Sequence, residues 1–213
     1  MKSFLKVFLF VGILGDTAEL KAWDYESLEP LFRDQLSEGG AVSFPLRPDE
    51  SDELDGRFVT VGQMIKGSRE GIWVVINDKE DAEKFVDGVL ESKVIEEGEN
   101  LIVAAQRTKV GGPKGSYRYT LRHELTPMIR ADFSFVEGEM RNVIGSWWIF
   151  DGPDSDTFLV VYSLFIDPGL FAPQFVVKSG MKKSMPGTLL SMQREVLRRR
   201  NLSVQEEKKE GTE

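Results

Sequence analysis

The chain has 213 residues, a formal net charge of −8 and no cysteine, with 41% hydrophobic and 29% charged residues. This length and balance predict a soluble globular protein with one ordinary core. The acidic charge argues against a nucleic-acid partner, because phosphate binding needs clustered Lys and Arg. The lack of cysteine excludes disulfides, thiolate metal sites and cysteine nucleophiles.

The first 22 residues combine a basic start with an apolar run over residues 7–15. The run is too short to span a bilayer, and the pattern is that of a secretory signal peptide. The cleavage end is poor, because Leu20 stands where a small residue is preferred. We expect residues 1–22 to direct export to the periplasm or the medium. The alternative is a cytoplasmic protein whose N-terminus packs on the core.

Residues 23–56 are expected to form an extension made of one helix and one acidic loop. The helix is predicted over 24–36, with Leu28, Leu31 and Phe32 on its buried face and a stop at Gly39. The loop over 45–56 carries two prolines and five acidic residues, which favours exposure to solvent.

The next segment is predicted to hold a strand over 57–64, two short helices and a strand hairpin. The helices are expected over 69–77 and 78–85, with Ser68 as the N-cap of the first. Trp73 and Ile76 mark the buried side of the first helix, and Phe85 anchors the second. The hairpin strands are predicted over 90–96 and 101–108.

Four further strands are predicted over 117–125, 128–136, 142–150 and 158–166. Apolar and polar residues alternate along them with period two, which gives a sheet with one apolar face. Arg118 and Arg122 are expected to point away from that face. Trp148 lies opposite the apolar set and fits this alternation poorly. A sheet with one apolar face must cover it.

The expected cover is a long helix over 173–199. Its apolar residues sit three or four apart and form one stripe: Val177, Met181, Met185, Leu189, Met192 and Val196. Pro186 is expected to kink the helix, because it lacks one amide donor and its ring crowds the preceding turn. Residues 201–213 are polar and charged and are predicted to be a disordered tail.

Short motifs run through the second half of the chain in a definite order: Asp132-Phe133 with Glu137-Gly138, Gly145-Ser146-Trp147, Tyr162, Asp167-Pro168-Gly169 and the helix after Pro173. This order resembles the START-like helix-grip superfamily (SRPBCC), and within it the bacterial polyketide cyclase/dehydrase and coenzyme-Q-binding branch. The resemblance implies an α+β fold over 57–200. Seven antiparallel strands would wrap around the long C-terminal helix and enclose a hydrophobic cavity, with two short helices after the first strand.

The expected binding site is the lining of that cavity. It comprises the inward aromatic residues of the sheet and the apolar stripe of the last helix: Tyr119, Phe133, Phe135, Trp147, Tyr162, Met181, Met185, Leu189 and Met192. Methionine is flexible and polarizable, so it adapts to varied apolar ligands. The alternative is that these side chains simply fill the core.

Polar chemistry is sparse in the sequence. His123 is the only histidine, so a multi-histidine metal site is excluded, and it is expected at the surface or the cavity rim. No catalytic residue, metal or cofactor is predicted. Basic residues of the last helix, among them Lys182, Lys183 and Arg194, predict a solvated face or a transient contact with a membrane surface.

The resulting expectation is a non-catalytic carrier for a hydrophobic small molecule such as a lipid, a quinone or a polyketide-like compound. One alternative is a cyclase or aromatase, which requires a polar dyad deep in the cavity. A second alternative resembles the ribosome-associated toxins of the superfamily and requires a protein partner. The sequence does not indicate an oligomeric state.

Overall fold

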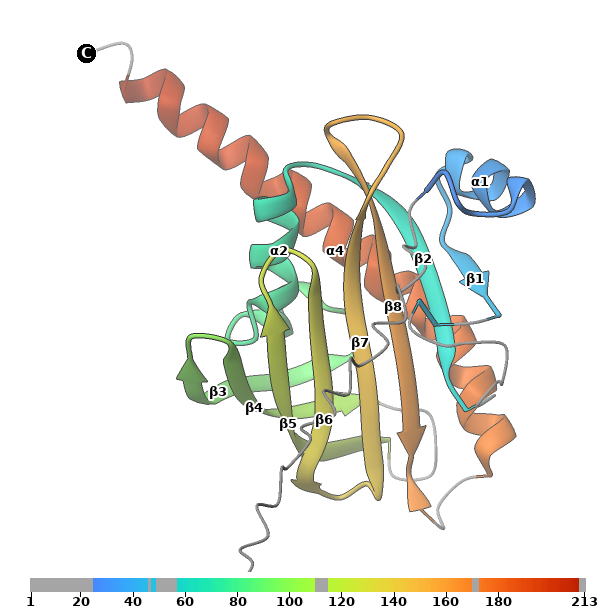
Figure 1. The fold of residues 1–213 in the computed structure, drawn as a ribbon. Coiled ribbons are helices and arrows are strands. Elements are labelled where there is room, and N and C mark those ends of the chain that lie inside the picture. Colours follow the sequence, from blue (N-terminus) through green and yellow to red (C-terminus); the bar gives the residue numbers. More distant parts are fainter. Residues whose placement is uncertain (1–24, 46, 49–56, 110–114, 170–172, 211–213) are drawn as a thin grey trace, which may run out of the picture.

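The computed structural model describes residues 25–45, 47–48, 57–109, 115–169 and 173–210. These residues form an antiparallel eight-stranded sheet and four helices, so the expected α+β fold is confirmed (Figure 1). The helices are α1 (Pro30–Ser37), α2 (Arg69–Asn77), α3 (Ala82–Phe85) and α4 (Gln174–Glu210). The strands are β1 (Val42–Phe44), β2 (Val59–Lys66), β3 (Val89–Gly98), β4 (Leu101–Lys109), β5 (Ser116–Thr126), β6 (Arg130–Gly138), β7 (Asn142–Asp151) and β8 (Thr157–Asp167). The predicted export signal at 1–22 lies outside the described residues, as does the acidic run at 49–56.

The expected count of seven strands is wrong, because β1 adds an eighth. The sheet order is β1-β2-β8-β7-β6-β5-β4-β3, and β1 pairs with β2 at one edge. The ring of Phe44 lies over Gly62 of β2, where an added Cβ would come within 2.6 Å of the ring. Three residues are too short a run for an alternating pattern to identify, which is why the sequence did not reveal β1.

Two helices at the beginning of the chain differ from their predicted bounds. Helix α1 begins at Pro30 rather than at residue 24, with the proline in the first turn, where its missing amide is tolerated. Leu36 of α1 is buried, whereas Leu31, predicted on the same face, is 60% exposed. Helix α3 is a single turn, and it starts four residues later than expected.

The last helix is longer than predicted. It continues through residue 199 to Glu210, so residues 201–210, expected to be disordered, are helical. Residues 211–213 lie outside the described part. The segment is rich in Glu, Lys and Gln, which propagate a helix well even where nothing packs against it. Pro186 lies inside this continuous helix. No helix of the described residues combines the length and hydropathy needed to cross a bilayer.

Both faces of the sheet carry a cover, which on the outer face lies over β1, β2, β7 and β8, and each cover makes its own core. The inner core joins α2 and α4 to the concave face, with Ile72, Val75 and Ile76 on the buried side of α2. Ser68 caps α2 as predicted, because its hydroxyl accepts a hydrogen bond from Gly71 N at 3.0 Å. The outer core joins the N-terminal extension to the other face, through Leu28, Leu36, Val42, Phe44, Trp148, Leu159 and Val161.

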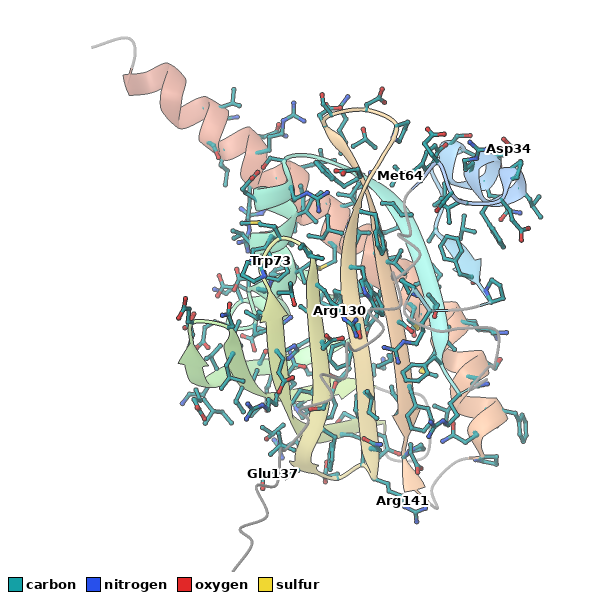
Figure 2. The ribbon with its side chains drawn as sticks, in the orientation of Figure 1. Asp34, Met64, Trp73, Arg130, Glu137 and Arg141 are labelled. Carbon is teal, nitrogen blue, oxygen red and sulfur yellow. The ribbon has the colours of Figure 1, made fainter. Side chains whose placement is uncertain are left out.

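The outer core explains why Trp148 departs from the predicted alternation. Trp147 and Trp148 are both buried, one on each face of β7, because each face has its own cover. Arg130 stacks on the Trp148 ring, with its guanidinium 5.0 Å from the ring centroid. Figure 2 shows Arg130 on the face of the sheet turned away from α4. Its neighbour Asp132 accepts hydrogen bonds there from Arg130 and Ser146.

The sheet is strongly bent, which creates the space beneath α4. In Figure 1, β3 and β4 run across the direction of β7 and β8, while α4 crosses the face of the sheet diagonally. Register shifts interrupt the β3–β4 pairing near Val89 and Val94 and the β5–β6 pairing near Thr120. Such bulges bend a strand and increase its twist. Helix α4 packs chiefly on β2 and α2, so the bent part of the sheet stands away from it.

Candidate functional site

A cavity of about 960 Å³ lies between α4, the segment from α2 to β3, and the concave face of the sheet. Strands β3 to β8 form its wall, and α4 forms its cover. This volume falls at the upper end of the range for sites that bind drug-sized molecules. The space that the sequence predicted under the last helix is therefore present.

Seven of the nine predicted site residues line this cavity: Tyr119, Phe133, Trp147, Tyr162, Met181, Met185 and Met192. Two do not belong to the lining. Leu189 is fully buried in the inner core, and Phe135 is half-buried and packs against that core. The helical stripe therefore faces the core along its whole length, and only part of it borders the cavity.

Aromatic rings form the wall opposite α4. The rings of Trp147 and Tyr162 stack, with centroids 3.9 Å apart and planes 6° apart, because these residues are direct partners across β7 and β8. Phe133 continues the wall, 6.3 Å from Tyr162. Its ring occupies the place of a side chain at Gly145, where an added Cβ would lie 2.2 Å from the ring. The glycine of the Gly145-Ser146-Trp147 motif therefore makes room for the wall.

Two tyrosines bring hydroxyl groups into the apolar lining. The Tyr119 hydroxyl shares a hydrogen bond of 2.7 Å with the Thr108 hydroxyl. Burial raises the pKa of Tyr119, against the opposing effect of that hydrogen bond. Burial also raises the pKa of Tyr162, and Tyr119 adds to the effect. Both phenols are therefore neutral at physiological pH and can donate hydrogen bonds to a bound molecule.

His123 is not at the surface or rim, contrary to the expectation. It is 3% exposed and lines the cavity, with its ring 5.6 Å from that of Phe133. Neither ring nitrogen has a hydrogen-bond partner among the described residues. The alternation along β5 could have predicted this burial. It places His123 on the same apolar face as Tyr117, Tyr119 and Leu121. A buried polar group without a hydrogen-bond partner lowers the stability of the fold by about 1–3 kcal/mol. A molecule in the cavity that forms a hydrogen bond with this ring would remove that cost.

Lys79 is a charged, buried site residue that the sequence did not reveal. It lies directly after α2, is 7% exposed and lines the cavity. Its ammonium donates a hydrogen bond to the carbonyl oxygen of Ile76, at the C-terminal end of α2 where a cation is favoured. Burial lowers its pKa to about 8, although the nearby charge of Asp78 raises it. The acidic residues beside it in the sequence led to the prediction that this segment is exposed to solvent.

The polar groups influence one another across the cavity. Burial holds the pKa of His123 well below its usual value, and the positive charge of Lys79 lowers it further. His123 is therefore neutral at physiological pH, with one donor and one acceptor nitrogen. Lys79 and His123 are therefore two buried polar groups that border the same cavity.

The basic face predicted on α4 is largely occupied by ion pairs. Arg198 and Arg199 both bind the carboxylate of Glu195, and Arg199 also binds Asp78. Arg194 lies 3.5 Å from Asp87. Lys182 and Lys183, nearer the start of the helix, are exposed.

Metal binding finds no support in the described ranges, where no three His, Asp or Glu side chains are grouped so that they could hold an ion. What the cavity offers instead is a large apolar surface with one buried cation, Lys79, a neutral imidazole and two phenols. Such a lining can bind an apolar body and hydrogen-bond to a polar group on it.

Comparison with known families gives one match that covers more than half of the chain. The family model described as polyketide cyclase / dehydrase and lipid transport matches residues 65–192. These residues run from the end of β2 to the Met192 turn of α4, and they include the wall and cover of the cavity. A search of curated proteins finds no match.

Solved structures share the fold at low sequence identity. The Zhui aromatase/cyclase from Streptomyces sp. R1128 is 16% identical, with a TM-score of 0.55 over 70% of this chain and 95% of that one. A STAR-related lipid transfer protein from Xanthomonas axonopodis is 13% identical, with a TM-score of 0.59 over 74% and 98% of the two chains. Human StAR-related lipid transfer protein 5 is 16% identical, with a TM-score of 0.58 over 74% and 81%.

Proposed function

This chain belongs to the polyketide cyclase/dehydrase and lipid transport family, and on that basis we propose that it binds a hydrophobic small molecule in the cavity and carries it without catalysing a reaction. The cargo is a lipid, a quinone or a polyketide-like compound. The observation that carries the proposal is the open cavity of about 960 Å³ lined by aromatic and methionine side chains.

Burial of apolar surface would supply the affinity. A ligand that loses about 300 Å² of apolar surface gains on the order of 7 kcal/mol at about 25 cal/mol per Å². The loss of translational and rotational freedom removes at least about 4 kcal/mol of this. The remainder corresponds to weak, reversible binding, which suits a carrier that must release its cargo.

The test uses the neutral apolar fluorophore diphenylhexatriene, whose emission rises when it leaves water. We expect the wild-type protein to take it up with a stoichiometry near one, and native mass spectrometry of protein from its own host to find a lipid-like adduct. Met185→Glu places a charge in the lining and should abolish uptake. Leu202→Glu, at an exposed position near the end of α4, is the matched control. No uptake by the folded wild-type protein would refute the proposal.

The buried polar groups Lys79 and His123 favour a second candidate, a cyclase or aromatase. Lys79, His123 and Tyr162 are groups that could move protons during an intramolecular aldol condensation. A synthetic linear polyketone thioester tests this directly. An enzyme would form an aromatic product from it. If the His123→Phe variant loses this activity but still takes up diphenylhexatriene, the protein is an enzyme and not a carrier.

We propose that delivery involves a transient contact between the start of α4 and a membrane surface. Phe175 and Val176 border the cavity and are 74% and 45% exposed, so the opening has an apolar rim. The exposed Lys182 and Lys183 follow on the same helix and would favour anionic headgroups. Co-sedimentation should therefore be stronger with phosphatidylglycerol than with phosphatidylcholine vesicles, and weaker for Phe175→Ser. Equal sedimentation with both would contradict the contact.

We also propose that residues 1–22 direct export, which places the carrier in the periplasm or the medium. Their basic start and short apolar run support the idea. Amino-terminal sequencing of protein from its own host decides the question. A mature end near residue 23 is expected, and an intact Met1 in the cytoplasmic fraction would contradict export.

A further inference from the structure

The polar lining of the cavity is held in place by two different elements. Lys79 comes from the segment between α2 and α3, whereas His123 comes from the middle of the sheet on β5. Both are at least nine-tenths buried and both border the same cavity. Their side chains therefore meet any molecule that fills this space.

Lys79 is fixed by its neighbours rather than free to swing out into solvent. Its carbonyl oxygen accepts a hydrogen bond from the Ser92 hydroxyl on β3, and its amide donates to Asn77 O at 2.8 Å. The adjacent Glu80 carboxylate accepts from Val94 N at 2.7 Å. The bonds from Ser92 and Val94 tie the segment to β3 and hold the ammonium at the cavity wall.

Neither group has its hydrogen-bonding capacity filled by the protein. Within the described part of the chain, the Lys79 ammonium donates one hydrogen bond, to Ile76 O, although it carries three N–H groups. The His123 ring makes none there. The two acidic lining groups do not compensate for this, because Asp78 is engaged by Arg199, and Asp87 is exposed and paired with Arg194.

We propose that the ligand is amphipathic and carries an anionic oxygen head, a carboxylate or an ionised enol or phenol, which Lys79 and His123 receive. The inference rests on the proposed binding function and narrows its ligand class. The Lys79 ammonium supplies the opposite charge, and the His123 N–H adds a hydrogen bond to the same oxygen group. The apolar body lies along the Trp147–Tyr162 wall and the methionines of α4. A charge-assisted contact in a desolvated pocket discriminates such a head from a neutral one.

The experiment compares decanoic acid with methyl decanoate as competitors that displace diphenylhexatriene at pH 7. The two probes have the same chain and differ in the charge of the head. We expect the acid to bind at least about tenfold more tightly than the ester, a difference of about 1.4 kcal/mol. Lys79→Met should remove this preference by weakening the acid far more than the ester. Lys66 is paired with Asp156 outside the cavity, so Lys66→Met should leave the preference as it is in the wild-type protein.

The outcomes separate this inference from the function on which it rests. Uptake of diphenylhexatriene with equal affinity for acid and ester overturns the anionic head and leaves the carrier standing. Absence of uptake overturns the carrier itself. If Lys79→Met weakens acid and ester equally, the lysine is structural and the inference is wrong.

A second measurement needs no variant, because His123 is the only histidine in the sequence. In protein labelled with ¹⁵N-histidine, the two ring nitrogen signals therefore belong to this one residue. Decanoic acid should shift them, as one nitrogen gains an acceptor, and methyl decanoate should leave them nearer the free state. Identical spectra with both probes would contradict the proposed contact.

Discussion

Arg199 near the end of α4 and Asp78 directly after α2 are joined by an ion pair with a nitrogen-to-oxygen distance of 2.5 Å. The pair links residues 121 positions apart in sequence. It fixes the position of the segment that carries Lys79, because Lys79 is the next residue. The same arginine binds Glu195 one turn earlier on α4 at 2.6 Å, so a single side chain connects the cover of the cavity to its wall.

Arg199→Met should destabilise the protein by about 1–3 kcal/mol, because it leaves the partly buried Asp78 carboxylate without its cation. Urea denaturation measures the free energy of unfolding. Arg200→Met is the matched control, since Arg200 is exposed. Equal losses in the two variants would mean that the ion pair does not hold the helix.

Glu195 should make stability depend on pH in the acid range. Hydrogen bonds from Arg198 and Arg199 lower its pKa from 4.5 to about 2, against the opposing effect of burial. The stabilisation is present above pH 4.5 and is lost as the pH falls toward 2, because the unfolded chain binds the proton first. The full effect is on the order of 3 kcal/mol. Glu195→Gln should flatten this part of the pH profile of thermal stability, and an unchanged profile would contradict the assignment.

His123 should stay neutral at pH values where an ordinary histidine is charged. Its pKa lies well below 6.5 through burial and the charge of Lys79. Below pH 6.5 the unfolded state binds a proton that the folded state refuses, so stability falls as the pH decreases, by up to about 1.4 kcal/mol per pH unit. Titration of its ring signals by NMR gives the pKa, and Lys79→Met should raise it. A midpoint near 6.5 would show that the ring is open to solvent.

Substitution of glycine by alanine should have opposite effects on stability at two positions. Gly187→Ala in α4 should stabilise by about 0.5–1 kcal/mol, because a Cβ there meets nothing within 4 Å and alanine is the better helix former. Gly145→Ala should destabilise by about 1–3 kcal/mol, because its Cβ would lie 2.3 Å from Ser163 O and closer still to the Phe133 ring. Thermal unfolding of the two variants side by side measures the contrast, and shifts of the same sign would contradict it.

Sequence pattern predicted the elements whose residues repeat regularly. Alternation placed strands β5 to β8, and the spacing of Met181, Met185 and Met192 identified the buried stripe of α4. Ser68 gave the start of α2, because a capping residue acts within one turn. Elements without a repeat were misplaced or missed, such as the three-residue β1 and the single turn of α3.

The polar part of the site escaped prediction for a different reason. Lys79 stands among Asp78, Glu80 and Asp81, and a charged run of this kind normally faces solvent. Its burial depends on bonds to β3, which pairs with the segment only in the folded chain. The place of His123 could have been predicted, since it continues the apolar face of β5, but its lack of a hydrogen-bond partner among the described residues depends on which side chains the fold brings near it.

The short β1 has a consequence for the behaviour of the protein in concentrated solution. It pairs with residues 60–62 on the free side of β2, a strand buried along almost its whole length. The opposite border of the sheet is β3, which carries Glu91, Lys93, Glu96 and Glu97. Charged side chains on an edge strand disfavour its pairing with a strand of another molecule, whereas an uncovered apolar edge strand favours such pairing. The three residues of β1 therefore cover part of the apolar edge strand β2. Removal of the chain up to and including Phe44 would leave the backbone of β2 free to pair with a second molecule.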